Sequence, residues 1–132
     1  MRAAALALML AAVPALAQGQ QEPPPSADPP PRMAVAPAAE LRGLDKVTGQ
    51  TVDFTLADGE HFALGRLLVT AGECRYPAED PASNAFAWLT IREEGAAEPA
   101  FRGWMIAAAP ALSALDHPRY DVWVIRCSIS DG

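Results

Sequence analysis

The segment TVDFTL, residues 51–56, alternates polar and apolar side chains and decides the fold class. Alternation with a period of two places its apolar residues on one face of an extended chain, which is typical of a half-buried β-strand. Asp58 and Gly59 follow and favour a tight turn. The sequence therefore predicts a strand over 51–56 that ends in a turn.

Residues 60–64 are predicted to form the next strand. If the connection spans 57–59, Gly59 takes the left-handed position of the turn and Phe62 faces Phe54. A connection shorter by one residue would send Phe62 to the opposite face, because a one-residue slip reverses every side chain. We predict the three-residue connection.

Apolar runs predict four further strands, and the first of them is apolar on both faces and therefore central. They cover residues 67–71, 85–91, 101–106 and 120–129. In the last one, Trp123, Ile125 and Cys127 are expected to share a buried face. One or two of the three tryptophans are expected in the core, whereas an exposed tryptophan would indicate an interaction face.

Residues 107–118 are the segment with helical potential, and Pro110 and Pro118 leave room for about two turns. Residues 75–84 are rich in proline and acidic side chains and are predicted to form an exposed loop. The predicted fold is mostly β: a small antiparallel sandwich or barrel of about six or seven strands with one short helix.

The first seventeen residues predict export. A positive start is followed by an uncharged apolar run and by Pro14-Ala15-Leu16-Ala17, which has the small residues that signal peptidase recognises. The run is shorter than the roughly 20 residues of a membrane-spanning helix. We predict a signal peptide over residues 1–17 with cleavage after Ala17; a retained membrane anchor is the alternative.

Residues 18–39 form a second compositional unit, with seven prolines between positions 23 and 37. Proline removes backbone donors and favours extended, solvated chain. We therefore predict a disordered tether over 18–39, with a proline-rich ligand for a partner's groove as the alternative. Residues 40–132 are predicted to be one β domain.

The chain has two cysteines, Cys74 and Cys127. In an exported protein two cysteines most simply form one disulfide. Closing a loop of this length stabilises a fold by roughly 4 kcal/mol in the chain-entropy model. We predict that this bond joins the middle of the domain to its last strand.

Composition argues against several classes of function. The net charge is −6 and no cluster of Lys and Arg is present, which disfavours nucleic acid and anionic membrane surfaces as partners. His61 and His117 are far apart in sequence, and neither a metal-ligand spacing nor a glycine-rich phosphate loop occurs. We expect neither a metal nor a cofactor.

Ser113, His117 and Asp121 would align as a catalytic triad on a helix, but Pro118 interrupts it. The simpler interpretation is that residues 116–118 turn the chain into the last strand, with Asp121 bonding nearby amides. The prediction is that the protein is not an enzyme.

The late part of the chain resembles a known signature. The resemblance lies in Phe101–Ala107, Pro110–Pro118, Tyr120–Val124 and Cys127, and earlier in Leu44–Gly49 and in Leu64–Leu67 before Cys74. It is the signature of the DUF2155 family, exported proteins of alphaproteobacteria without an assigned activity. Departures from the family are Ala108-Ala109 where two serines are frequent, Arg102 for a small serine and Arg119 for a valine.

The resemblance implies a periplasmic location and no particular reaction. Genes of the family often neighbour one for an accessory subunit of the proton-pumping NADH dehydrogenase. The leading hypothesis is thus a periplasmic, non-enzymatic accessory module that docks on an envelope or respiratory membrane complex at the outer face of the inner membrane. The alternatives are a small-molecule or glycan-binding domain and, third, a hydrolase.

The docking surface is predicted in the segment 103–120, where a strand runs into a bend with two prolines. An irregular segment beside apolar side chains is typical of an interaction face. The alternative is that the apolar residues simply close one end of the domain. The residues predicted to form this face are Trp104, Met105, Leu112, Leu115, His117 and Tyr120.

Overall fold

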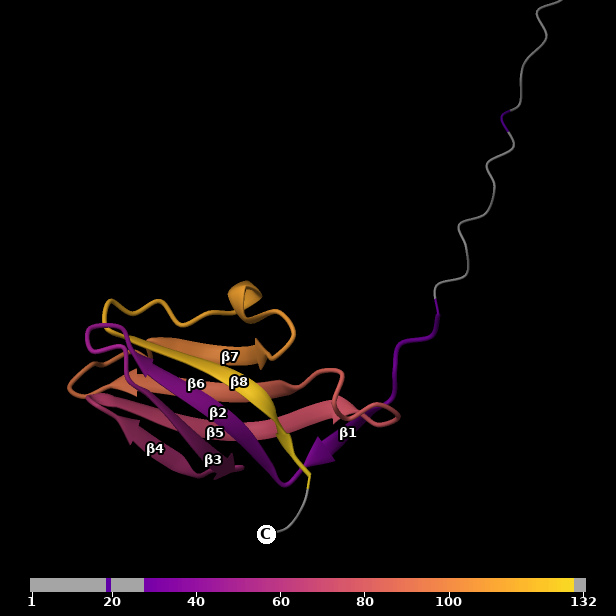
Figure 1. The fold of residues 1–132 in the computed structure, drawn as a ribbon, viewed down its shortest axis with the longest axis horizontal. Coiled ribbons are helices and arrows are strands. Elements are labelled where there is room, and N and C mark those ends of the chain that lie inside the picture. The colour runs from indigo at the N-terminus through magenta and orange to yellow at the C-terminus, as the bar shows by residue number, and fades with distance from the viewer. Residues whose placement is uncertain (1–18, 20–27, 130–132) are drawn as a thin grey trace, which may run out of the picture.

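The computed structural model describes residue 19 and residues 28–129, and the predicted signal peptide lies outside this part of the chain. The described residues form eight strands and one short 3₁₀ helix (Figure 1). They are β1 (Met33–Ala36), β2 (Ala38–Asp45), β3 (Thr51–Ala57), β4 (His61–Leu64), β5 (Leu67–Pro77), β6 (Phe86–Glu93), β7 (Phe101–Ile106), η1 (Pro110–Leu112) and β8 (Tyr120–Ser128).

The strands form two antiparallel sheets that pack face to face. The large sheet has the order β1-β5-β6-β7, and β4 pairs with β5 along the edge that β1 also uses. The small sheet has the order β3-β2-β8 and lies in front of the large one in Figure 1. Neither sheet closes on itself, so the predicted β fold is confirmed as a sandwich, and the barrel alternative is wrong.

The strands predicted from periodicity are present, and β5 is central as expected. The disordered tether predicted up to residue 39 is wrong for residues 33–39, because β1 begins at Met33 and β2 at Ala38. The proline run ends at Pro31, so the following amides are free to pair with β5. Pro37 stands between the two strands, where the chain bends from one sheet to the other.

The turn at Gly59 is confirmed, since Gly59 has φ +86°, but the pairing expected around it is wrong. β3 pairs with β2 and β4 pairs with β5, so the chain crosses from the small sheet to the large sheet here instead of forming a hairpin. Phe54 and Phe62 do face each other, with ring centroids 4.2 Å apart, as a stack between the two layers.

The core lies between the sheets and is filled by inward-facing aliphatic side chains. Leu41 of the small sheet and Val69, Leu89 and Ile91 of the large sheet have no exposed surface. Burial of one such side chain contributes about 1.5–3 kcal/mol. The described residues place no charged or polar residue in this core, so the polar chemistry of the domain lies on its outer surfaces.

The face predicted for β8 is wrong in part. Val122, Val124 and Cys127 are buried, while Trp123 and Ile125 are only partly so. The register with β2 shifts between Glu40 and Leu41, which leaves one extra residue on β8. Such a bulge reverses the alternation, so Cys127 faces inward on the side opposite to Trp123.

The two-turn helix predicted over 107–118 is also wrong. A single 3₁₀ turn, η1, starts at Pro110, and its residues are not buried. Pro118 limits any helix in this segment to about two turns, and so short a helix is marginal in water unless tertiary packing supports it. The exposed loop expected from residue 75 begins later, since β5 extends to Pro77.

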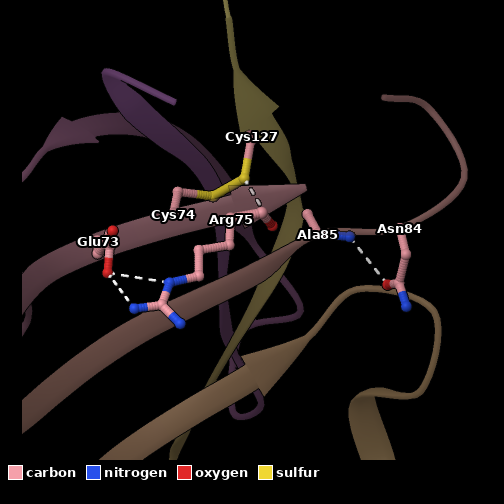
Figure 2. The surroundings of a disulfide bond; sticks show 6 residues. All are labelled: Glu73, Cys74, Arg75, Asn84, Ala85 and Cys127. Atoms are coloured by element: carbon pink, nitrogen blue, oxygen red, sulfur yellow. Dashed lines mark hydrogen bonds and ion pairs between the residues drawn. A yellow bond between two sulfur atoms is a disulfide. The ribbon is translucent and has the colours of Figure 1, made fainter. Parts of the chain in front are cut away.

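The predicted disulfide is present and joins Cys74 of β5 to Cys127 of β8 (Figure 2). The bond therefore links the large sheet to the small sheet, and both cysteines are buried. Figure 2 also shows Arg75, the next residue of β5, extending away from the disulfide toward Glu73. The disulfide is thus adjacent in sequence to Arg75, whose side chain lies on the outer side of the large sheet.

Candidate interaction surface

The six residues predicted to form an interaction face do not lie on one surface. Met105 is 2% exposed and Leu115 is 6% exposed, so both belong to the core and their assignment to the face is wrong. Trp104 precedes Met105 on β7 and points to the opposite side of the sheet, because side chains alternate along a strand. Leu112 lies on η1 and is 79% exposed.

Trp104 instead belongs to an aromatic patch on the outer side of the large sheet. Trp104 is paired in register with Trp88 of β6, and their rings meet edge to face at a centroid distance of 5.4 Å. Both are partly exposed, and so is Trp123 on the small sheet. The expectation that one or two tryptophans lie in the core is therefore wrong.

A bulge in β5 makes room for the indole of Trp88. The register with β6 shifts between Ala71 and Cys74. A Cβ on Gly72, within the bulge, would lie 3.0 Å from Cδ1 of Trp88. A larger residue at position 72 would therefore crowd the indole, and glycine lets it lie against the backbone.

Arg75 completes the patch on the other side of Trp104. Its guanidinium carbon lies 4.9 Å from the centre of the Trp104 ring, which is cation–π distance. Glu73 accepts bonds from Nε and Nη2 of Arg75 at 3.0 and 2.7 Å. The guanidinium is therefore oriented by two neighbours on its own sheet.

Beside Trp104 the surface forms an open hollow of about 270 Å³. Its lining residues are Met33, Arg75, Phe86 and Trp104. Met33 is 42% exposed and lies beside two partly exposed aromatic side chains, so the hollow has a mainly apolar lining. We call the five residues Met33, Arg75, Phe86, Trp88 and Trp104 the aromatic face.

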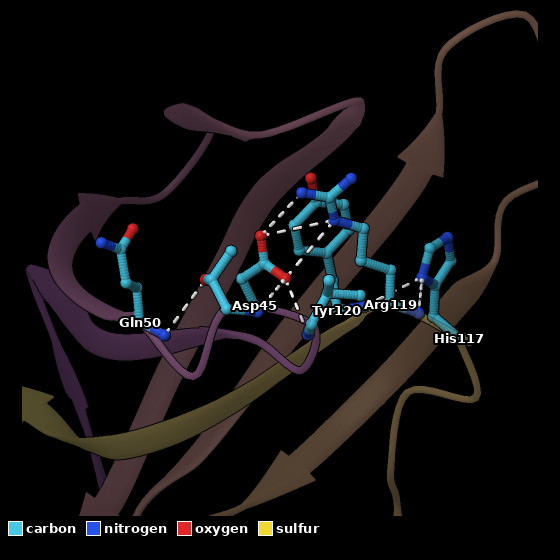
Figure 3. A network of polar contacts seen from close by, with 7 residues as sticks. Asp45, Gln50, His117, Arg119 and Tyr120 are labelled. Atoms are coloured by element: carbon cyan, nitrogen blue, oxygen red, sulfur yellow. Dashed lines mark hydrogen bonds and ion pairs between the residues drawn. The ribbon is translucent and has the colours of Figure 1, made fainter.

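A second polar cluster lies at one end of the sandwich and is centred on Asp45 (Figure 3). Its carboxylate accepts a bond from Nη2 of Arg119 at 2.9 Å and from the amides of Val47 and Thr48 at 2.9 and 3.3 Å. The Arg119 hydrogen bond is the main cause that lowers the pKa of Asp45. The carboxylate closes the β2–β3 turn and ties it to the start of β8.

Replacing Arg119 by alanine is expected to raise the pKa of Asp45 toward the ordinary value of about 3.9. Because the folded-state pKa is lowered, ionised Asp45 stabilises the fold above the unfolded-state pKa. This contribution is lost as the pH falls through the folded-state pKa. Carboxyl NMR titration of both proteins measures the shift, and identical midpoints would contradict the assignment.

His117 belongs to this end cluster and has the role of a turn acceptor. Its Nδ1 accepts the amides of Arg119 and Tyr120, both at 3.1 Å, and Lys46 donates to its carbonyl at 2.5 Å. The ring stacks on Tyr120 at a centroid distance of 5.6 Å. Asp121 binds the Val122 amide at 2.9 Å, as expected for a residue that bonds nearby backbone.

Replacing His117 by alanine is expected to lower the free energy of unfolding by about 1–3 kcal/mol, because two amide donors lose their acceptor. Its side chain is only 10% exposed, so the loss is of a nearly buried group. Urea denaturation measures the change. His117→Asn, which retains an acceptor, is expected to recover part of it, and a His117→Ala variant with wild-type stability would contradict this role.

A model described as an uncharacterised protein conserved in bacteria, DUF2155, matches residues 39–127. The chain belongs to the DUF2155 family. The matched region begins in β2 and ends at Cys127, so it contains both cysteines and every strand from β3 to β7, whereas β1 lies before it.

The chain is also similar to a protein of Rickettsia prowazekii (strain Madrid E). It is the uncharacterised protein RP359, which is 25% identical over 91 residues. The similarity covers 67% of this chain and 59% of the relative, so the chain spans less than two thirds of that protein. No solved structure matches the chain.

Several residues that carry the DUF2155 resemblance meet in the end cluster. The Tyr120 hydroxyl lies over Gly65, where a Cβ would be 2.0 Å from the oxygen. Gly65 also has φ +55°, a left-handed conformation that favours glycine. The turns after β2 and β4 and the start of β8 are thus locked together by packing and hydrogen bonds, which is a structural role.

The aromatic face includes residues that sequence reasoning missed. Arg75 lies in the segment predicted to be an exposed loop, and Met33 lies in the segment predicted to be a tether. Alternation with Cys74 was the available signal for Arg75: if Cys74 faces the core, the next residue faces outward.

Among the described residues, no helix has the length and apolar character needed to cross a bilayer. Within the same residues, His, Cys, Asp and Glu side chains do not gather in threes as metal ligands.

Proposed function

We propose that this DUF2155 domain is a non-enzymatic interaction module that docks on a protein assembly of the cell envelope through its aromatic face. The observation that supports it is the partly exposed Trp88–Trp104 pair with Arg75 beside it, on the outside of a sandwich whose core is filled by other residues. Tryptophan and arginine are the residue types that most often dominate binding energy at protein interfaces.

The position of the tether supports the same surface. Met33 of β1 lines the hollow and directly follows the proline-rich segment. Arg32 pairs with Glu79 at 3.0 Å, which holds the end of this segment near the edge of the large sheet. The proline-rich segment therefore joins the domain beside the hollow, and a partner that contacts this segment would also lie near the aromatic face.

The proposed compartment is the periplasm, and the proposed assembly is a respiratory membrane complex such as the proton-pumping NADH dehydrogenase. The predicted signal peptide and the buried disulfide support export, since disulfides persist in oxidising compartments. Mass spectrometry of protein from its native host is expected to find the mature N-terminus at Gln18 and both cysteines bonded. Free thiols together with an intact leader would contradict export.

Crosslinking followed by purification from native membranes tests the docking proposal. The full chain, with a tag after Gly132, is expected to be recovered in a defined complex with an envelope protein. Recovery only as a free monomer after crosslinking would overturn the proposal. A Trp123→Ala variant is the matched control, because Trp123 lies on the outer side of the small sheet and its loss should leave the complex intact.

A small-molecule or glycan-binding role is the second candidate, and the hollow supports it. Phe86 and Trp104 give the hollow two partly exposed aromatic walls, and Arg75 adds a hydrogen-bond donor. This candidate predicts saturable quenching of tryptophan fluorescence by soluble oligosaccharides such as chitotetraose. Quenching that Trp104→Ala abolishes would favour it; no change across a panel of sugars would exclude it.

A further inference from the structure

The outer side of the large sheet is basic, although the chain as a whole is acidic. Arg102 lies two residues from Trp104 on β7, and Arg92 lies four residues from Trp88 on β6, so alternation places both on the same side as the tryptophans. Arg75 is the third cation of this side. Glu73 is the carboxylate paired with Arg75, and the net charge of the whole chain is −6.

The arginines of the two sheets differ in their pairing. On the small sheet, Arg42 forms a two-pronged pair with Asp53 at 2.6 and 2.9 Å, and Arg126 pairs with Glu40. These cations are neutralised within the chain. In the described part of the chain, Arg92 and Arg102 have no carboxylate partner, and both are exposed. Arg92 donates one hydrogen bond, from Nη1 to the Ala97 carbonyl at 2.8 Å, and keeps its uncompensated charge.

We propose that the aromatic face, flanked by Arg92 and Arg102, binds an acidic segment of a protein partner that carries at least one large apolar side chain. Carboxylates of the segment pair with Arg92 and Arg102, and the apolar side chain enters the hollow beside Trp104. Arginine suits this role because its planar guanidinium binds a carboxylate through two hydrogen bonds. The inference rests on the proposed function and specifies the chemistry of its partner.

A peptide segment fits these observations better than an anionic lipid surface does. Membrane association by charge needs a cluster of cations, and about 1 kcal/mol is gained per basic residue near the surface. The acidic remainder of the chain would be repelled by such a surface. A short segment contacts only the local cations, because charges beyond the Debye length of roughly 8 Å are screened at physiological ionic strength.

Selection of a phage library of random dodecapeptides on the immobilised full chain tests the inference. The expected peptides are enriched in Asp and Glu around an aromatic or large aliphatic residue. Arg102→Gln is expected to weaken binding of a selected peptide about tenfold, as is typical when one charged hydrogen-bonding partner is removed. The matched variant Arg126→Gln removes one charge from the small sheet and should leave the affinity unchanged.

Three results would overturn the inference: no enriched peptide, enriched peptides without excess acidic residues, or equal losses in the Arg102→Gln and Arg126→Gln variants. Binding to phosphatidylglycerol vesicles or heparin that depends on Arg102, with no peptide selected, would assign the face to a lipid or a glycan. If crosslinking from membranes finds a protein partner while the library yields no acidic peptide, the proposed function stands and this inference fails.

Discussion

Replacing Cys74 and Cys127 together by alanine is expected to lower the free energy of unfolding by about 4 kcal/mol. The disulfide closes a loop with a sequence separation of 53 and joins the two sheets between β5 and β8. Without it, the unfolded chain gains conformations that the crosslink excludes. A domain of this size has roughly 5–15 kcal/mol of stability in total, so the change is a large fraction of it.

Urea denaturation followed by circular dichroism measures this loss. Dithiothreitol should destabilise the wild-type protein by a similar amount and leave the double variant unaffected, which controls for effects of the reductant. A loss below about 1 kcal/mol would show that packing between the sheets suffices without the covalent link.

Replacing Trp88 or Trp104 by alanine is expected to weaken partner binding by about 30-fold or more, which corresponds to the 2 kcal/mol or more of an interface hot spot. The two rings contact each other, so the double variant should lose less than the sum of the single losses. Trp104→Ala also removes the ring on which Arg75 stacks, and we expect it to have the larger effect.

The quantity to measure is the recovery of the crosslinked complex, or its dissociation constant once the partner is identified. Each variant should keep the disulfide and the wild-type circular dichroism spectrum, because both tryptophans lie outside the core. Trp123→Ala provides the matched loss of an outward-facing indole on the other sheet. Equal losses from all three variants would argue against a specific aromatic face.

The strands were predictable because one face of each sheet is buried, so the sequence of the strands alternates. Residues 51–56 show this directly and fold as β3, whereas the strand over 85–91 was predictable from its apolar run and folds as β6. The disulfide was also predictable, since the two cysteines of an exported protein most simply form one disulfide. Strand β1 was not predictable from the sequence. It has four residues, and the prolines on both sides of it indicate an extended, unpaired segment.

The details that place the candidate site depend on irregularities that periodicity does not show. Bulges in β5 and β8 each shift the register by local backbone geometry, and the β8 bulge moves Trp123 and Ile125 to the outer side. Trp104 and Met105 are adjacent in sequence but lie on opposite sides of β7. An interaction face defined as a continuous segment therefore mixed surface and core residues.

Site-specific photocrosslinking tests whether the domain docks on its partner through the aromatic face. A photoreactive benzoylphenylalanine replaces Phe86 on the aromatic face in one protein and Trp123 on the small sheet in the other, each expressed as the full chain in the native host. After irradiation, we expect a covalent adduct with an envelope protein from position 86 and none from position 123. An adduct from position 123 alone, or from neither position, would contradict docking through the outer side of the large sheet.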